Sequence, residues 1–261
     1  MEAAAGADEN ASMRLLHRHL RVICALGWLA ASAGLVAAPG PALGATRQRD
    51  TAPSTRARAS AARNPASNRT LSQATLWACE ANPSGAACVN SVLTAINRAR
   101  SAEGVRAMRL PAGFAGLSLP AQLLAIANLE RSDRGLTAAI GLSRSLDQNA
   151  LTAARADQDP VPNPFYGNAY GSNWAGGIGS TLAVDFLWMY DDGPGSSNVD
   201  CRSAQSAGCW GHRQNVLYPY QPPLAMGAAV SGTSMTEVFV GGDARTRPGQ
   251  ADAPLALRSV R

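Results

Sequence analysis

The chain has 261 residues, of which 46% are hydrophobic and 16% are charged, with a formal net charge of +5. This composition supplies enough apolar material for one ordinary domain and excludes a highly charged disordered protein. All 23 basic residues are arginine and only three residues are histidine, which excludes lysine-based catalysis and a metalloprotease of the HExxH type.

The first 44 residues have the pattern of a secretory signal peptide. Three arginines precede an uncharged run over Val22–Ala38, and Ala42-Leu43-Gly44 supplies small residues for cleavage. A start at Met13 fits this pattern better than one at Met1, because residues 1–12 carry acidic side chains that a signal lacks. We therefore predict a secreted, extracellular protein with no membrane span in its mature chain.

The excess positive charge is confined to one segment. Residues 45–70 hold six arginines and one aspartate, a net charge of +5, whereas residues 71–261 hold 14 arginines and 14 acids. The first segment, rich in Arg, Ala, Ser and Pro, is typical of a disordered basic linker, and residues 245–261 are typical of a flexible tail. Because residues 71–261 carry no net charge, we expect no nucleic-acid partner.

Residues 71–244 have the pattern of one folded domain with an extra N-terminal helix within residues 75–120. Apolar residues at helical spacing predict four helices, and two short Val-containing runs around Gly232-Thr233 predict a β-hairpin. The expected helices begin near Val89, Ser118, Ser145 and Ser180, and the strands cover 225–231 and 235–241. Helices followed by late strands indicate an α+β fold, with the helices packed on a small antiparallel sheet.

Two segments 31 positions apart share a residue pattern. INRARSAEGV (Ile96–Val105) and ANLERSDRGL (Ala127–Leu136) share an Asn, an Arg three positions on and a Gly four positions further. We interpret them as two helix C-termini built alike, each ended by a glycine in the left-handed conformation. We also expect each shared Arg to pair with an acid on its own last turn.

Four cysteines remain once Cys24 is removed with the signal. In an exported chain they predict two disulfides, for which three connectivities are open. The pairing of sequence neighbours, Cys79–Cys88 with Cys201–Cys209, is the simplest. Either crossed pairing would instead tie the added N-terminal region to the rest of the domain.

The segment from Trp188 to Leu217 contains the most informative motifs. Trp188 is followed three residues later by Asp191, and Gly211–Leu217 has the sequence GHRQNVL. This segment resembles the CAP (SCP) superfamily of cysteine-rich secretory, antigen 5 and pathogenesis-related proteins, in its bacterial secreted branch. Upstream, Asn128 and Arg131 resemble the family's Asn-x-x-Arg helix, and residues 170–175 resemble its Gly-Glu-Asn-Ile-Ala loop.

The resemblance implies an αβα sandwich with a cleft that holds two histidines and two acids. His212 matches the second histidine, and Asp191 stands in place of the second Glu. The first histidine would fall at Ala127 and the first Glu at Ser172. With half of the set missing, we expect no certain cofactor and at most a weak divalent metal at His212 and Asp191.

We therefore predict a monomeric protein that acts by binding rather than by catalysis. A small-molecule or cell-envelope ligand would lie against His212, Asp191, Ser172 and Asn173. Two alternatives stay open: a secreted hydrolase using Ser172 or a His212-activated water, and a structural cell-envelope protein. His212 has a structural alternative too, as a hydrogen-bonding residue that holds its loop to the last long helix.

Overall fold

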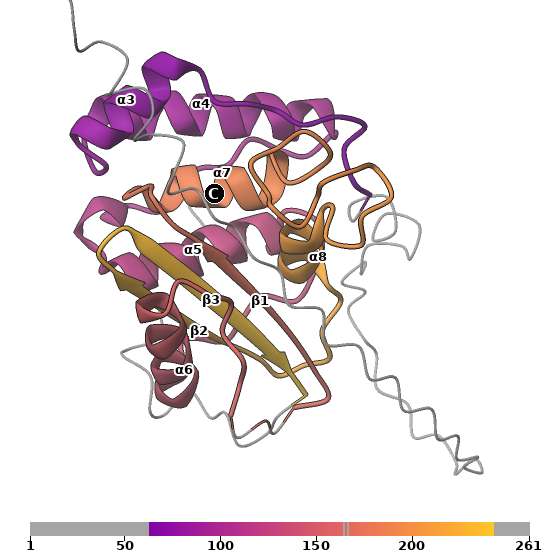
Figure 1. The fold of residues 1–261 in the computed structure, drawn as a ribbon. Coiled ribbons are helices and arrows are strands. Elements are labelled where there is room, and N and C mark those ends of the chain that lie inside the picture. The colour runs from indigo at the N-terminus through magenta and orange to yellow at the C-terminus, as the bar shows by residue number, and fades with distance from the viewer. Residues whose placement is uncertain (1–62, 164, 166, 243–261) are drawn as a thin grey trace, which may run out of the picture.

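The computed structural model describes residues 63–163, 165 and 167–242 (Figure 1). The predicted signal peptide, the linker up to residue 62 and the tail 245–261 lie outside the described residues. The elements, in chain order, are α3 (Gln73–Ala81), α4 (Ala86–Ala102), the 3-10 turn η1 (Phe114–Gly116), α5 (Leu119–Ser132), α6 (Arg144–Arg155), β1 (Ala169–Ala175), α7 (Thr181–Tyr190), α8 (Gly211–Leu217), β2 (Leu224–Ser231) and β3 (Ser234–Gly241).

The described strands form one antiparallel sheet with the order β1-β3-β2. The β2–β3 hairpin turns at Gly232-Thr233, as predicted, and Gly232 has a φ of 62°, which glycine adopts without strain. The resemblance predicts a loop over residues 170–175, but β1 pairs with β3 along its whole length, from Ala169 opposite Gly241 to Ala175 opposite Met235. Aromatic side chains at positions 170 and 174 favour this strand because they pack well on a pleated surface.

Helices cover both faces of the sheet, which gives the expected α+β class and a sandwich (Figure 1). On one face, Leu146 of α6 packs against Ala225, Val238 and Val240. On the other face, Met235 and Phe239 belong to the main core, with residues of α5, α7 and α8. Because side chains alternate along a strand, odd-numbered residues of β3 face α5, α7 and α8, and even-numbered residues face α6.

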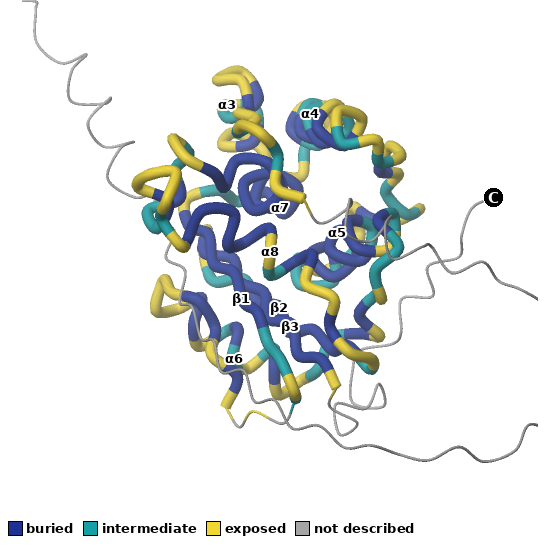
Figure 2. Tube along the Cα trace, turned by 90° about the vertical axis from the view of Figure 1, so that its right-hand side faces the viewer, coloured by how far each residue is buried: buried dark blue, intermediate teal, exposed yellow. Residues whose placement is uncertain are grey.

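The added N-terminal region consists of two helices rather than one. Ser72 begins α3, where its Oγ accepts a hydrogen bond from the Thr75 N–H (3.1 Å), and Asn82-Pro83-Ser84-Gly85 separates α3 from α4. The Cys79–Cys88 disulfide joins the two helices, and Cys201–Cys209 closes the loop before α8, so the neighbour pairing is confirmed. Both helices lie outside α7, every residue of which is buried (Figure 2).

The two echoed segments end their helices in the same way. Asn97 Oδ1 accepts from the Met108 N–H (2.6 Å), and Asn128 Oδ1 accepts from the Ala139 N–H (2.7 Å), eleven residues on in both cases. Gly104 and Gly135 have φ values of 70° and 73°, so the prediction of two similar left-handed ends is confirmed.

The expected pairing of each shared arginine with an acid on its own last turn is wrong. Arg100 reaches across to α5, where it contacts Glu130 (2.7 Å) and Asp133. Arg131 donates to the backbone carbonyls of Thr137 (2.7 Å), Val216 and Tyr218. Both guanidinium groups are buried, so they bond to groups inside the fold rather than to acids on their own solvent-facing surface.

The end of the predicted linker contacts the domain. The Arg69 N–H donates to the Tyr190 carbonyl (2.7 Å). The Asn68 side chain donates to the Gly193 carbonyl and accepts from the Gly193 N–H.

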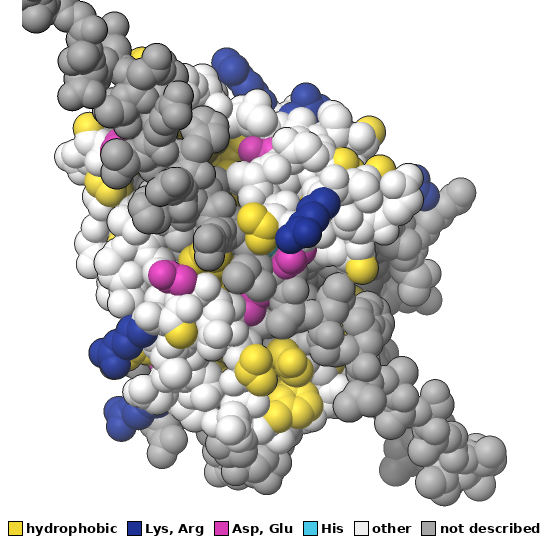
Figure 3. All heavy atoms as spheres, in the orientation of Figure 1, with side chains coloured by type: hydrophobic (Ala, Val, Ile, Leu, Met, Phe, Trp, Pro, Cys, Tyr) yellow, Lys and Arg dark blue, Asp and Glu magenta, His cyan; other side chains and the backbone are white. Residues whose placement is uncertain are grey.

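On the face drawn in Figure 3, arginine and acidic side chains are scattered, and neither charge forms a single patch. Among the helices of the described ranges, none combines the length and apolar character needed to cross a membrane.

Candidate functional site

The centre of the site is His212 at the start of α8. Its ring Nδ1 lies 2.6 Å from Asp192 Oδ1, and its backbone N–H donates to Asp192 Oδ2 (2.9 Å). Asn198 Nδ2 also donates to Asp192 Oδ1 (2.6 Å). An ionised Asp192 favours a hydrogen on Nδ1, so this carboxylate fixes both the tautomer and the orientation of the ring.

The acid that contacts His212 is therefore Asp192, whereas the motif spacing indicates Asp191. Adjacent aspartates after a helix cannot be told apart by spacing alone. Asp192 accepts from the N–H groups of His212 and Arg213 (3.3 Å) in the first turn of α8. It thus satisfies backbone donors at a helix start twenty residues further along the chain.

Asn173 connects the site to the sheet. Its Nδ2 donates to the His212 carbonyl (3.2 Å) and to Glu237 Oε1 (2.8 Å), its direct partner across β1 and β3. Asn215 Nδ2 in turn donates to Asn173 Oδ1 (3.0 Å). Asn173 thus links β1, β3 and α8, which is a structural role.

Glu237 is a second acid that the motifs did not indicate. It is 2% exposed, and burial raises its pKa to about 8, although the Asn173 hydrogen bond, His212 and Arg131 act in the opposite direction. At neutral pH Glu237 is therefore mostly a neutral carboxylic acid. Its signal was present in the sequence, as an acid at an inward-facing position of the strand MTEVFV.

Asp185 of α7 is a further buried acid on this side of the sheet. Burial raises its pKa well above the usual value, and the nearby acids Glu130 and Glu237 act in the same direction. Its Oδ2 has no hydrogen-bond partner among the described residues. Asp185 and Glu237 are thus two buried carboxyl groups whose pKa values are raised by burial.

Ser172 lies on the opposite face of the sheet from His212. It is paired with Val238, whose side chain packs with Leu146 of α6, whereas the neighbouring Asn173 points to α8. The structure therefore does not bring the Ser172 hydroxyl to the His212 ring. A hydrolase that pairs Ser172 with His212 has no geometric support here.

Asp191 lies at the C-terminal end of α7, beside the His212–Asp192 pair. Burial, together with the adjacent Asp192, raises the pKa of Asp191 to about 6. Its Oδ1 is buried and has no hydrogen-bond partner in the described part of the chain. Of the four predicted ligand-site residues, only Asp191 has a buried side-chain oxygen that the described residues leave without a partner.

The residues present do not fit the metal tetrad that the family resemblance implies. Ala127 and Ser172 stand where the first His and the first Glu would be, and Ser172 faces away. Within the described ranges, no three His, Cys, Asp or Glu side chains are placed to hold a metal ion together. The assignment of His212, Asp191, Ser172 and Asn173 to a ligand site stays a prediction.

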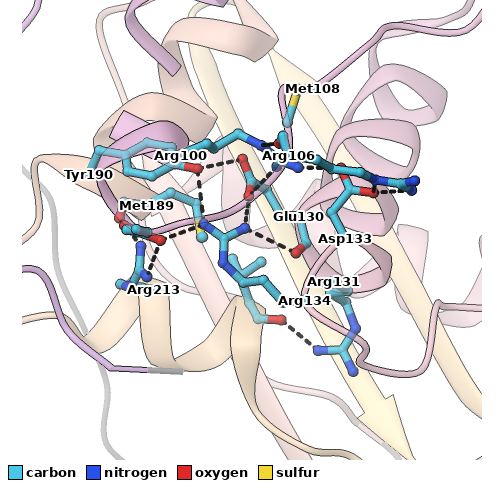
Figure 4. Close-up of polar contacts among 12 residues, drawn as sticks. Arg100, Arg106, Met108, Glu130, Arg131, Asp133, Arg134, Met189, Tyr190 and Arg213 are labelled. Carbon is cyan, nitrogen blue, oxygen red and sulfur yellow. Dashed lines mark hydrogen bonds and ion pairs between the residues drawn. The ribbon is translucent and has the colours of Figure 1, made fainter. Parts of the chain in front are cut away.

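A buried ion-pair network connects the end of α4 to this site (Figure 4). Arg213, directly after His212, donates to the Met189 carbonyl (2.7 Å) and to Glu103, which follows α4 (2.9 Å). Glu103 also accepts from Arg134, just beyond α5 (2.7 Å). One carboxylate at the end of α4 thus holds the end of α5 and the start of α8 in place through two arginines.

Glu130 is the most enclosed acid of this network. It contacts Arg100 (2.7 Å) and Arg134, and it accepts from the Tyr190 hydroxyl (2.9 Å). Burial alone would raise its pKa, but the two guanidinium groups outweigh burial and hold the pKa below its usual value. Glu130 therefore stays ionised inside the protein.

No protein-family model matches this sequence, and no curated protein matches it. Three solved structures are similar. A cysteine-rich secretory protein from Staphylococcus aureus and an extracellular protein containing an SCP domain from Bacillus anthracis are each 16% identical, with a TM-score of 0.34. Each match covers 47% of this chain, but only 38% and 40% of the respective bacterial protein.

The third structure is venom allergen-like protein 4 from Schistosoma mansoni. It is 18% identical with a TM-score of 0.33, and the match covers 52% of this chain and 97% of that protein. All three are CAP/SCP proteins. The motifs of Trp188–Leu217 resemble the same superfamily.

Proposed function

We propose that this chain is an extracellular, monomeric CAP-like domain that binds a small or cell-envelope ligand and does not catalyse a reaction. The CAP-like motifs and the two disulfides support this proposal, since disulfides persist in oxidising compartments. A small antiparallel sheet with helices on both faces also agrees with the sandwich that the motifs imply.

The observation that carries the proposal is the closure of the polar site. His212 and Asp192 are each 1% exposed and bond to each other, and Asn173 is fully buried. A general base must reach the proton that it removes, directly or through one water. The His212 ring is enclosed and bonded to the Asp192 carboxylate, which favours a structural role over catalysis.

Asp191 is the group that we assign to the ligand. Its unpartnered Oδ1 distinguishes it from Asp192, whose oxygens bond to His212, Arg213 and Asn198. At 9% exposed, Asp191 is less enclosed than His212 and Asp192. A ligand that donates a hydrogen bond to this carboxyl group would favour the ionised form of Asp191. Binding by this route becomes stronger as pH rises through about 6, where the free carboxyl ionises.

The test compares two neighbouring variants, Asp191→Asn and Asp192→Asn, in the oxidised protein. Binding to insoluble bacterial cell-wall polysaccharide is measured by co-sedimentation at pH 5 and pH 7.5, and stability is measured by urea unfolding. We expect Asp191→Asn to weaken binding about tenfold with little loss of stability. Asp192→Asn, the matched control, is expected to lower the free energy of unfolding, because one amide oxygen cannot accept from both the two backbone N–H groups and the ring.

Two results would contradict the proposal. One is turnover of an ester or peptide substrate that disappears in a folded His212→Ala variant. The other is retention on the polysaccharide that is unchanged in Asp191→Asn and lost only when residues 45–70 are deleted, which would favour a structural envelope protein held by its linker.

A further inference from the structure

A cavity of about 240 Å³ lies away from the His212 cluster. It forms where the α3–α4 loop and η1 meet the first turns of α5 and α7. Its walls are mainly apolar side chains, and no lining residue is charged; the apolar ones include Val89, Leu110, Phe114, Leu119 and Leu182. Ser84 and Ala115 line the cavity and are exposed, so its mouth reaches solvent.

The residues that line the cavity include a buried polar pair. The Thr181 hydroxyl donates to Gln122 Oε1 (2.8 Å), and Gln122 Nε2 donates to the Leu117 carbonyl (3.1 Å). An amide NH2 has two hydrogens, and a hydroxyl oxygen accepts as well as donates. Gln122 and Thr181 therefore keep hydrogen-bonding capacity for a molecule inside the cavity.

We propose that this cavity binds an uncharged small molecule that has an apolar body and one hydroxyl or carbonyl group. This inference rests on the proposed binding function and names the ligand class. An apolar cavity of ~150 Å³ admits benzene, so one about 1.6 times larger suits two fused rings. A charged ligand is disfavoured, because the lining offers no opposite charge to offset the loss of its hydration.

The added helices supply part of the wall. Pro83 and Ser84 come from the α3–α4 loop and Val89 comes from α4, whereas Gln122 and Thr181 belong to α5 and α7. A bound molecule therefore contacts both the added helices and the rest of the fold. This gives the α3–α4 pair a role in binding in addition to its cover of α7.

The test uses three related probes with the oxidised protein: 2-naphthol, naphthalene and 2-naphthoate. Binding is followed by calorimetry and by probe fluorescence. We expect one site for 2-naphthol, weaker binding of naphthalene by about threefold to tenfold, and weaker binding of 2-naphthoate. Ala115→Trp fills the mouth and is expected to weaken 2-naphthol binding more than tenfold, whereas Ala107→Trp, an exposed control in the same connection, leaves it unchanged.

Thr181→Val gives a second readout that does not depend on filling the cavity. It retains the side-chain shape but removes the hydroxyl, so we expect the advantage of 2-naphthol over naphthalene to decrease while naphthalene binding persists. Equal 2-naphthol binding in Ala115→Trp and the unmodified protein would overturn the inference, and so would tighter binding of 2-naphthoate. If the protein sediments with cell-wall polysaccharide but binds none of the probes, this inference fails and the proposed function stands; if it binds neither, both fail.

Discussion

Glu130→Gln tests whether the buried ion pairs hold the added helices to the domain. The substitution keeps the side-chain volume but removes the charge that faces Arg100 and Arg134. Both arginine side chains are fully buried, so they lose a counter-charge that water cannot replace. Removing one partner of a buried pair destabilises by about 3–5 kcal/mol, and we expect a loss of that size in the free energy of unfolding.

Urea unfolding of the oxidised protein, followed by tryptophan fluorescence, measures this loss. Because the pKa of folded Glu130 is held below its usual value, its stabilising effect is full above the unfolded pKa of ~4.3 and declines as pH falls through the folded pKa. The difference between the two proteins should therefore be constant from pH 7 to 5 and shrink in stronger acid.

The matched control is Glu80→Gln, the same substitution at an exposed position of α3. It should change the free energy of unfolding by less than about 0.5 kcal/mol. If Glu130→Gln is within about 1 kcal/mol of this control, or if its effect does not depend on pH, the network does not stabilise the fold as we argue.

Three further predictions concern other parts of the fold. Glu237 has a pKa raised to about 8 in the folded protein, so the free energy of unfolding falls as pH rises from ~4.3 towards 8. In urea unfolding, Glu237→Gln should therefore be nearly neutral at pH 4.5 but stabilising at pH 8.5, by an amount on the order of 5 kcal/mol. Replacing Cys79 and Cys88 by serine should lower the free energy of unfolding by about 2.5 kcal/mol, measured in the same way, for a loop of this length. Gly104→Ala and Gly135→Ala should each lower the free energy of unfolding, measured by thermal melting, by a similar amount of about 1 kcal/mol, because both positions have positive φ.

The long elements could be predicted from the sequence because their signals are local. The helices that begin near Val89, Ser118, Ser145 and Ser180 correspond to α4 to α7, and the Gly232-Thr233 turn defines the β2–β3 hairpin. β1 could not be predicted in this way, since the strand forms through its partner β3, far along the chain. The seven residues of α8 were likewise too short to show a helical period.

The site was predicted only in part, for a similar reason. Asn173 donates to the His212 carbonyl, but which acids lie beside these residues depends on packing. Asp192 rather than Asp191 contacts the ring, and Glu237 joins the site through strand register. The spacing of residues along the sequence shows neither which aspartate contacts His212 nor which residue lies opposite Glu237.

The matched ends of α4 and α5 differ in charge at a position where they contact each other. At each helix end, the asparagine side chain bonds the backbone of the residue eleven positions on: Asn97 bonds Met108, and Asn128 bonds Ala139. If the two segments had the same residue at each position, equivalent charged side chains would repel each other when placed side by side. Glu103 in the first segment corresponds to Arg134 in the second, and these opposite charges form an ion pair at 2.7 Å. This difference in charge joins the two helix ends, together with the contacts of Arg100 to Glu130 and Asp133.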